Sequence, residues 1–347
     1  MRGRFDNARR IEALDPVADH LAIHRLTLTE EFPWDMRMAF NLAFNRSFAL
    51  PRVARQLVAT GAILRSPRKR ADDTGIIMYE ILLHGTESAR GKLAIRRLND
   101  AHRGFALDNG DSIYVLAALV VIPMRWLRRY GWRRPTANER EAAAVFYRRV
   151  GRLMGVRDLP DSFGDFEAYL EQYERAQLHP TPEAAQIERT TRDLLRGRIP
   201  ARLRGAADAL IGALYDEPLR AAYDVPRPPL WARAGLHTAL RVRALLLRFF
   251  ARPRTTPLFA DGIVTKSYPD GYNLAHVGSG TATGEPIEPA SVRSEVPATG
   301  EPNGPASVRS EVPATGAPDE PASVQEEPPA TGAPIGPASV RSEECGS

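Results

Sequence analysis

The sequence predicts an all-α protein, and three observations support this class. Apolar residues recur at three-to-four spacing over most of residues 1–278. Residues that typically start helices precede several of these stretches, and no run of alternating β-branched residues is bounded by turn signals. With 347 residues, of which 43% are hydrophobic, the chain is long enough to bury a core. We therefore expect one helical-bundle domain over residues 1–278, followed by a tail over residues 279–347.

Three helix starts can be recognised in order along the chain. Asp15 is followed by a proline, the pattern of a cap and a first-turn proline, so we expect a helix to begin there. Thr136 and Glu139 have the spacing of a capping box, in which each side chain accepts a hydrogen bond from the other residue's backbone. Thr181, again followed by a proline, is the third predicted start.

The longest apolar run covers residues 113–124 and ends at Pro123, Met124 and Arg125. It is too short for a membrane span, which needs about 20 residues. Its first residues have strand-like composition, but the run continues to Trp126 without a turn signal, which favours a buried helix. The N-terminal residues show no apolar core of a signal peptide, so we expect a cytoplasmic protein that is soluble or peripheral to a membrane.

Residues 231–250 form a basic amphipathic stretch with arginines at 233, 241, 243 and 248 among leucines and phenylalanines. We expect this stretch to pack on the bundle with its arginines outward. Peripheral contact with a membrane surface through residues 231–250 is the alternative.

Charge divides the chain into a basic body and an acidic tail. The net charge is +5, although eleven acidic residues stand against three arginines from residue 285 onward. A basic body can favour nucleic acid, anionic lipid or an acidic partner. Nucleic acid is not expected, because the arginines are scattered through amphipathic helices and form no recognisable binding module.

The tail has a repeating composition without aromatic residues. Proline, alanine, serine, threonine, glycine and glutamate dominate, and a 16-residue repeat starts at residues 288, 304, 320 and 336. Each repeat offers one or two valines, too little apolar surface to offset the entropy of ordering, so we expect disorder. The only cysteine is Cys345, which excludes a disulfide framework or a cysteine-based metal site within one chain.

Histidines are the first candidates for chemistry. His102 continues the apolar helical stripe of Gly91, Ala94, Ile95 and Leu98, so we expect its ring to point into the interior. A buried imidazole needs a hydrogen-bond partner or a metal. From the residues alone, a hydrogen-bonded core histidine is the simpler interpretation.

The remaining histidines carry weaker signals. His20 and His24 are four residues apart, a spacing that can hold a metal on a helix, but no His-Glu motif surrounds them. His84 precedes a glycine where a helix should end, which favours a role in capping. His179 and His237 have no partner visible in the sequence.

Charged and hydroxyl side chains before residue 75 form a second group of candidates. Arg70 and Thr74 share a helical face, so they can converge on one small ligand. Asp73, like Asp72, can act as a base if burial raises its pKa. An acidic helix start, favoured by the helix dipole, is the structural alternative for both carboxylates.

Seven short motifs in a fixed order give the chain a family resemblance. They are KRADDT at 69–74, RLNDAH at 97–102, DSIYVL at 111–116, PMRW at 123–126, YGWR at 130–133, EREA at 139–142 and GRLMG at 151–155. Together they resemble the oxygenase family that includes MpaB and the latex clearing proteins, or rubber oxygenases. Trp126, Tyr130 and Trp132, within these motifs, are expected to pack in the core, with lining of a substrate channel as the alternative.

The resemblance implies a helical bundle around haem b, with His102 as the axial ligand of the haem iron. It places Arg70 and Thr74 on the opposite side of the haem, where they shape the oxygen pocket. The family's lysine position falls on Asp73, so the sixth iron position is expected to be open or water-bound. His84 is the alternative axial ligand.

The function implied by the resemblance is a haem-dependent oxygenase. It would use dioxygen on a small apolar, unsaturated substrate such as an isoprenoid, with oxidative cleavage of a carbon–carbon double bond. The alternative is a non-catalytic helical domain that kept the scaffold and binds lipid or another ligand, and the departure at Asp73 keeps this alternative open.

Overall fold

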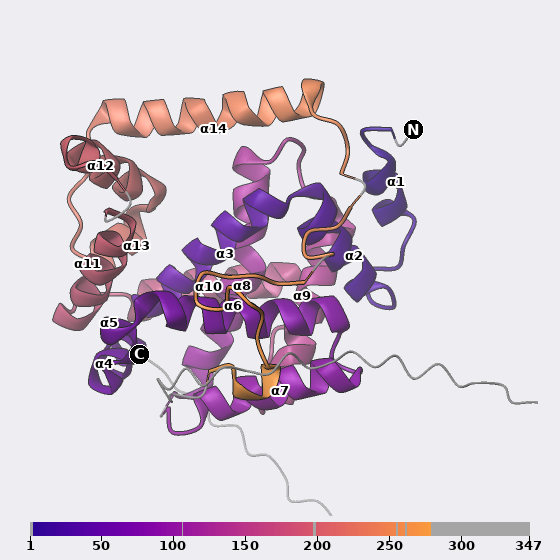
Figure 1. The fold of residues 1–347 in the computed structure, drawn as a ribbon, viewed down its shortest axis with the longest axis horizontal. Helices are drawn as coiled ribbons and strands as arrows, with labels where there is room; N and C mark the ends of the chain where they lie inside the picture. The colour runs from indigo at the N-terminus through magenta and orange to yellow at the C-terminus, as the bar shows by residue number, and fades with distance from the viewer. Residues whose placement is uncertain (1–2, 106, 197–198, 255, 261, 279–347) are drawn as a thin grey trace, which may run out of the picture. The chain divides into compact units, whose positions relative to one another are not determined.

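The computed structural model describes residues 3–278 apart from 106, 197–198, 255 and 261. The described part is built from helices (Figure 1), and its only strand-like feature is an isolated bridge between Thr265 and Tyr268. The all-α prediction is therefore confirmed. The predicted disordered tail over residues 279–347 lies outside the described residues, and its boundary at residue 278 stays a prediction.

The helices follow one another with short connections. The first half contains α1 (Asp6–Glu12), α2 (His20–Leu26), a π-helical turn (Thr27–Glu31), α3 (Pro33–Phe48), α4 (Pro51–Thr60), α5 (Ala62–Arg65), α6 (Pro67–His84) and α7 (Ala89–His102). The second half contains α8 (Asn109–Tyr130), α9 (Ala137–Leu153), α10 (Phe163–Gln177), α11 (Pro182–Arg196), α12 (Arg204–Leu214), α13 (Glu217–Ala222) and α14 (Leu230–Phe250), with 3₁₀ turns at Ala201–Leu203 and Leu274–His276.

Two of the three predicted helix starts are confirmed. The Thr136 hydroxyl accepts a hydrogen bond from the backbone N–H of Glu139, and the Glu139 carboxylate accepts one from the N–H of Thr136, so the capping box opens α9. Thr181 likewise accepts from the backbone three residues on, at the start of α11. The start at Asp15 was wrong. Its carboxylate accepts from the N–H groups of the next residues in a separate turn, and α2 begins only at His20.

Helix α8 forms the centre of the core and contacts α3, α9, α10 and α14. It continues past Pro123 to Tyr130, so the apolar segment is longer than the run at residues 113–124 suggested. By length and composition alone α8 is the one described helix that could cross a membrane, which corrects the expectation that the run is too short. However, 78% of its most apolar window is buried inside the bundle, the pattern of a core helix.

The α6–α7 hairpin positions the candidate site. Gly85, with φ of 72°, ends α6 in a conformation that side chains rarely adopt. The Ser88 hydroxyl caps α7 by accepting from the N–H of Gly91. An added Cβ at Gly91 would lie 1.6 Å from the Gly85 carbonyl oxygen, so only glycine allows this close turn. Because the two helices contact each other along the hairpin, the start of α6 lies near the end of α7.

Helix α14 is oriented differently from the expectation that its arginines face outward. Arg243 points inward, donates to the buried carboxylate of Asp35 and stacks over the Trp34 ring at 3.9 Å. The buried side of α14 is a narrow stripe of Ala232, Leu240 and Ala244. Large apolar side chains are instead exposed on its other side: Leu230, Trp231, Val242, Leu245, Leu246, Phe249 and Phe250.

Candidate active site

His102 is the last residue of α7, and its ring orientation is set by its own helix. Its Nδ1 lies 2.8 Å from the carbonyl oxygen of Leu98. A carbonyl only accepts hydrogen bonds, so Nδ1 carries the proton and Nε2 keeps its lone pair. The residue is half-buried, and the apolar stripe that leads to it is buried as predicted.

The electrostatic surroundings of His102 keep its imidazole neutral. Burial lowers the pKa of His102, and the nearby positive charge of Arg70 lowers it further. The hydrogen bond to the Leu98 carbonyl opposes these effects without cancelling them. The charge of Arg70 is therefore felt at His102, and the placement of Arg70 and Thr74 on the opposite side of the haem stays a prediction.

Thr74 lies one turn after Arg70 on α6, as its spacing predicted. Its hydroxyl donates to the backbone carbonyl of Arg70 at 2.9 Å. The hydroxyl proton of Thr74 is therefore already donated within α6. Unless the side chain rotates, the hydroxyl oxygen can only accept a hydrogen bond from a ligand.

Asp73 is buried and takes part in a three-residue cluster. Its carboxylate lies 3.0 Å from the ammonium of Lys69 and accepts a hydrogen bond from the Tyr268 hydroxyl at 2.6 Å. Lys69 also lies 3.1 Å from the Tyr268 oxygen. Lys69 and Asp73 meet because residues four apart share a helical face. An amine is thus present one turn before the position where the family carries one.

The segment after α14 crosses α6 and α7 and adds residues that the motifs did not single out. The Asp72 carboxylate accepts from the backbone and hydroxyl of Ser267. The Tyr272 hydroxyl donates to Glu80, and Arg97 donates to the Val277 carbonyl at 2.9 Å. These contacts fasten the segment over the hairpin that carries Arg70 and His102.

Glu80 is the buried acid of this region, and sequence reasoning missed it. Burial raises its pKa, but hydrogen bonds from Arg90 and Tyr272 outweigh burial, so the net pKa is lowered. His84 lies 3.4 Å from Glu80 and is exposed. His84 does end α6 as predicted, and its partner is the Glu80 carboxylate. The sequence does contain a signal for Glu80, because it is the one acidic residue among the isoleucines of α6.

His20 and His24 are both buried residues of α2. His24 is 1% exposed and packs against the Phe146 ring at 4.9 Å, with no hydrogen-bond partner for either ring nitrogen. Burial, reinforced by His20, lowers the pKa of His24 to about 3. Within the described residues no three His, Cys, Asp or Glu side chains gather as metal ligands.

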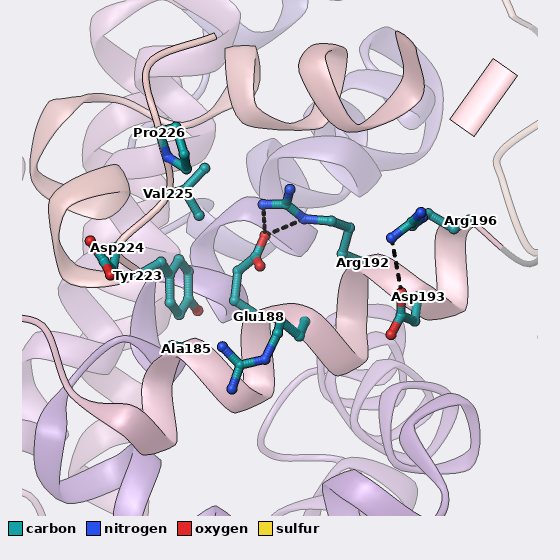
Figure 2. Close-up of a pocket in the computed structure, with 10 residues that line it drawn as sticks. Ala185, Glu188, Arg192, Asp193, Arg196, Tyr223, Asp224, Val225 and Pro226 are labelled. Carbon is teal, nitrogen blue, oxygen red and sulfur yellow. Dashed lines mark hydrogen bonds and ion pairs between the residues drawn. The ribbon is translucent and has the colours of Figure 1, made fainter. Parts of the chain in front are cut away.

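Two cavities lie away from these residues. The smaller, about 310 Å³, lies between α11 and the turn after α13. Figure 2 shows two ion pairs among its charged groups, Glu188 with Arg192 and Asp193 with Arg196. The larger, about 570 Å³, is enclosed by α3, α8, α12, α13 and α14. Neither cavity is lined by Arg70, Thr74 or His102.

Comparisons with known proteins place the chain in a family. Residues 34–248 match the domain described as "ER-bound oxygenase mpaB/B'/Rubber oxygenase, catalytic domain". The ER-bound oxygenase mpaB' of Penicillium brevicompactum is 25% identical over 256 residues, which cover 68% of this chain and 60% of the relative. The ER-bound oxygenase mpaB of the same organism is 24% identical over 254 residues, covering 68% of this chain and 58% of the relative.

The chain thus spans about 60% of the length of the curated relatives that it matches. A third relative, the ER-bound oxygenase mpaB of Penicillium roqueforti, is 26% identical over 140 residues, which cover 39% of this chain and 47% of the relative. The matched region contains all seven motifs and both helices of the α6–α7 hairpin. The chain belongs to the mpaB and rubber oxygenase catalytic-domain family.

Proposed function

We propose that this chain is a haem-dependent oxygenase that uses dioxygen on a small apolar, unsaturated, isoprenoid-like substrate, with oxidative cleavage of a carbon–carbon double bond. Membership of an oxygenase family supports the reaction class. The observation that carries the proposal is the geometry of His102: one ring nitrogen is held by the Leu98 carbonyl and the other keeps its lone pair.

The donor set at His102 fits a residue that would hold the iron of haem b. An imidazole that ligates iron is typically neutral and donates its other N–H to a carbonyl or carboxylate, which fixes the ring. His102 meets both conditions, because burial lowers its pKa and the Leu98 carbonyl accepts a hydrogen bond from its Nδ1–H. When bound, the haem iron supplies the activation of dioxygen.

The chain's own residues would set the electrostatics of that site. Arg70 lies close enough to His102 for its charge to be felt there, and a fixed cation stabilises negative charge that develops on oxygen. Thr74 can donate a hydrogen bond only after it rotates away from the Arg70 carbonyl. Asp73 stays a predicted proton acceptor. To take up a proton it must loosen its ion pair with Lys69, which opposes that role.

The visible absorption spectrum tests the proposal. Purified protein reconstituted with haem b should show a Soret band, and His102→Ala should lose or shift it. His84→Ala is the matched control, because it removes the alternative ligand, an exposed histidine paired with Glu80. Wild-type protein that takes up no haem would contradict the proposal. Loss of the band only in His84→Ala would assign the ligand to His84.

The surface of α14 favours a second property, peripheral contact with a membrane. Phe249 and Phe250 are 70% and 79% exposed, and Arg233, Arg241 and Arg248 lie on the same helix. Apolar side chains flanked by arginines suit a bilayer surface that contains anionic lipid. We propose that α14 lies on such a surface. This contact is also what the non-catalytic, lipid-binding alternative would require.

Co-sedimentation with phosphatidylcholine vesicles, with and without phosphatidylserine, tests the membrane contact. Phe249→Ser/Phe250→Ser should release the protein from phosphatidylserine vesicles. The control is Val17→Ser/Val264→Ser, which removes exposed apolar side chains elsewhere. Equal release by both variants would exclude α14 as the contact. Haem uptake is read separately, so vesicle binding without a Soret band would favour the non-catalytic alternative. A cytoplasmic location stays a prediction.

A further inference from the structure

The larger cavity has an apolar wall of the kind that holds a hydrocarbon chain. Its volume of about 570 Å³ falls within the range of about 300–1,000 Å³ typical of small-molecule sites. The wall is made by Leu42 from α3, Ile122 and Trp126 from α8, Leu214 from α12 and Leu219 from α13. The Trp126 indole N–H already donates to Asp35, so this ring presents carbon atoms to the cavity.

The cavity also carries positive charge that the described carboxylates do not balance. Arg46 pairs with Glu174 and Asp216, and Arg125 pairs with the acids at 167 and 171. Glu217 forms ion pairs with the arginines at 220 and 227.

Two lining arginines remain after these pairs are formed. Arg129 and Arg233 have no carboxylate partner among the ion pairs of the described residues. Arg129 donates instead to Nε2 of His237 at 3.1 Å. Both side chains line the cavity and are exposed, so a ligand can reach them.

His237 lies next to these arginines, and its hydrogen bonds define which ring nitrogen carries the proton. Arginine only donates, so Nε2 of His237 must accept, and Nδ1 therefore donates to the Tyr130 oxygen at 2.5 Å. Burial and the charges of Arg129, Arg241 and Arg233 lower the pKa of His237, which keeps it neutral. Arg129 and Arg233 thus line the cavity together with a neutral ring, an arrangement that attracts an anion.

This cavity is separate from the site proposed for haem. His102 lies shortly before the start of α8, whereas the cavity is lined by the last third of that helix. At about 1.5 Å per residue, the start of α8 and Trp126 are roughly 25 Å apart. The cavity instead borders α14, the helix that exposes its apolar side chains.

We propose that the cavity between α3, α8, α12, α13 and α14 binds a single-chain amphipathic anion, whose chain lies against Leu42, Ile122 and Trp126 and whose acidic head is held by Arg129 and Arg233. The proposal goes beyond the oxygenase function and does not depend on haem. Guanidinium groups bind carboxylates and phosphates through charge-assisted hydrogen bonds, so both head groups share the required chemistry.

Isothermal titration calorimetry with decanoate, below its micelle-forming concentration, tests the site in the full chain. Decanoate should bind with one-to-one stoichiometry. Decanol, which has the chain without the charge, should bind at least tenfold more weakly, and acetate should show no binding. Dodecyl phosphate serves as the second anionic probe and should bind like decanoate.

Two sets of variants locate the binding. Arg129→Gln/Arg233→Gln should weaken decanoate binding at least tenfold, since each removes a charge-assisted bond. Arg248→Gln/Arg252→Gln, which removes two arginines that do not line the cavity, should stay within about twofold of wild type. Leu214→Trp, which fills the apolar wall, should also weaken binding while melting temperature shows that the variant folds.

Three results would overturn the proposal. They are the absence of decanoate binding, equal binding of decanol, and an equal loss in the Arg248→Gln/Arg252→Gln control. The last result would mean that decanoate responds to overall charge. If Leu214→Trp does not fold, the arginine variants decide, because Arg129 and Arg233 are exposed and their replacement leaves the core intact.

Discussion

Helices α8 and α14 have nearly the same length, 22 and 21 residues, and both are rich in apolar side chains. They differ in how many of these side chains are buried. Nearly all apolar side chains of α8 are buried among its neighbours. Those of α14 are largely exposed, and the helix contacts the bundle through a narrow stripe. The placement of charge explains the difference. From Ser112 to Met124 α8 has no charged residue, whereas the arginines of α14 are spread from residue 233 to residue 248.

A helix with arginines spread along its length cannot be enclosed, because each buried guanidinium needs a carboxylate. The bundle supplies one such partner for α14, Asp35, which receives Arg243. The comparison therefore teaches that apolar content alone does not decide burial. The spacing of charges and the availability of partners decide it. The predictions below test this contrast.

The largest difference in stability is expected between two leucine-to-alanine substitutions, one in each helix. Leu127→Ala in α8 should lower the free energy of unfolding by about 2–5 kcal/mol, because Leu127 is fully buried and leaves a cavity. Leu246→Ala in α14, which is 53% exposed, should change it by less than about 0.5 kcal/mol. Urea unfolding measures both. Equal losses would mean that the outer face of α14 is covered in solution.

A buried histidine, His24 of α2, and the histidine of α14, His237, should differ in their effect on the pH dependence of stability. His24 stays neutral in the folded protein down to pH of about 3, whereas in the unfolded chain it takes up a proton below its ordinary pKa of about 6.5. The unfolded state therefore binds more protons between these values, and stability falls as the pH drops through this window. The slope of the free energy of unfolding against pH approaches about 1.4 kcal/mol per pH unit in this window.

His24→Leu should remove this slope, so the variant should lose less stability than wild type between pH 6.5 and 4. His237 also has a lowered pKa, but it is less buried, so His237→Leu should change the slope less. Thermal unfolding across this pH range compares the two variants. A slope unchanged in His24→Leu would show that another group controls acid stability.

Removing the anchor of α14 should have an intermediate effect. Arg243→Met leaves the buried Asp35 with only the Trp126 hydrogen bond and should cost about 1–3 kcal/mol. Adding Asp35→Asn should recover part of this loss, because the unpaired charge disappears. Arg241→Gln on the exposed side of α14 is the control and should be nearly neutral. Similar losses from Arg243→Met and Arg241→Gln would argue against the ion pair as the anchor.

The smallest effect is expected at the helix starts. Asp108 caps α8 by accepting from the N–H of Asp111 at 2.7 Å, so Asp108→Ala should cost about 1 kcal/mol. Asp108→Asn keeps an accepting oxygen and should retain most of the stability. Arg52→Ala measures the surface ion pair of Asp108 separately. At α14, Pro229 provides no side-chain cap, so Pro229→Ala should have less effect than Asp108→Ala.

The sequence by itself determined the features that depend on neighbours within a few residues. The capping box of Thr136 and Glu139, the apolar stripe leading to His102 and the shared face of Arg70 and Thr74 all follow from helical spacing. The motifs were sufficient to place the chain in its family, because they keep their order whatever the packing around them.

Only the tertiary structure decided which distant groups meet. Lys69 and Tyr268, which are 199 residues apart, share the Asp73 carboxylate, and His237 meets Tyr130 across 107 residues. The inward turn of Arg243 likewise depends on Asp35, 208 residues away. Local propensity carries no information about such partners. A buried charge selects whichever complementary group the folded chain brings within hydrogen-bond distance, because an unpaired charge in the core costs more than any local preference.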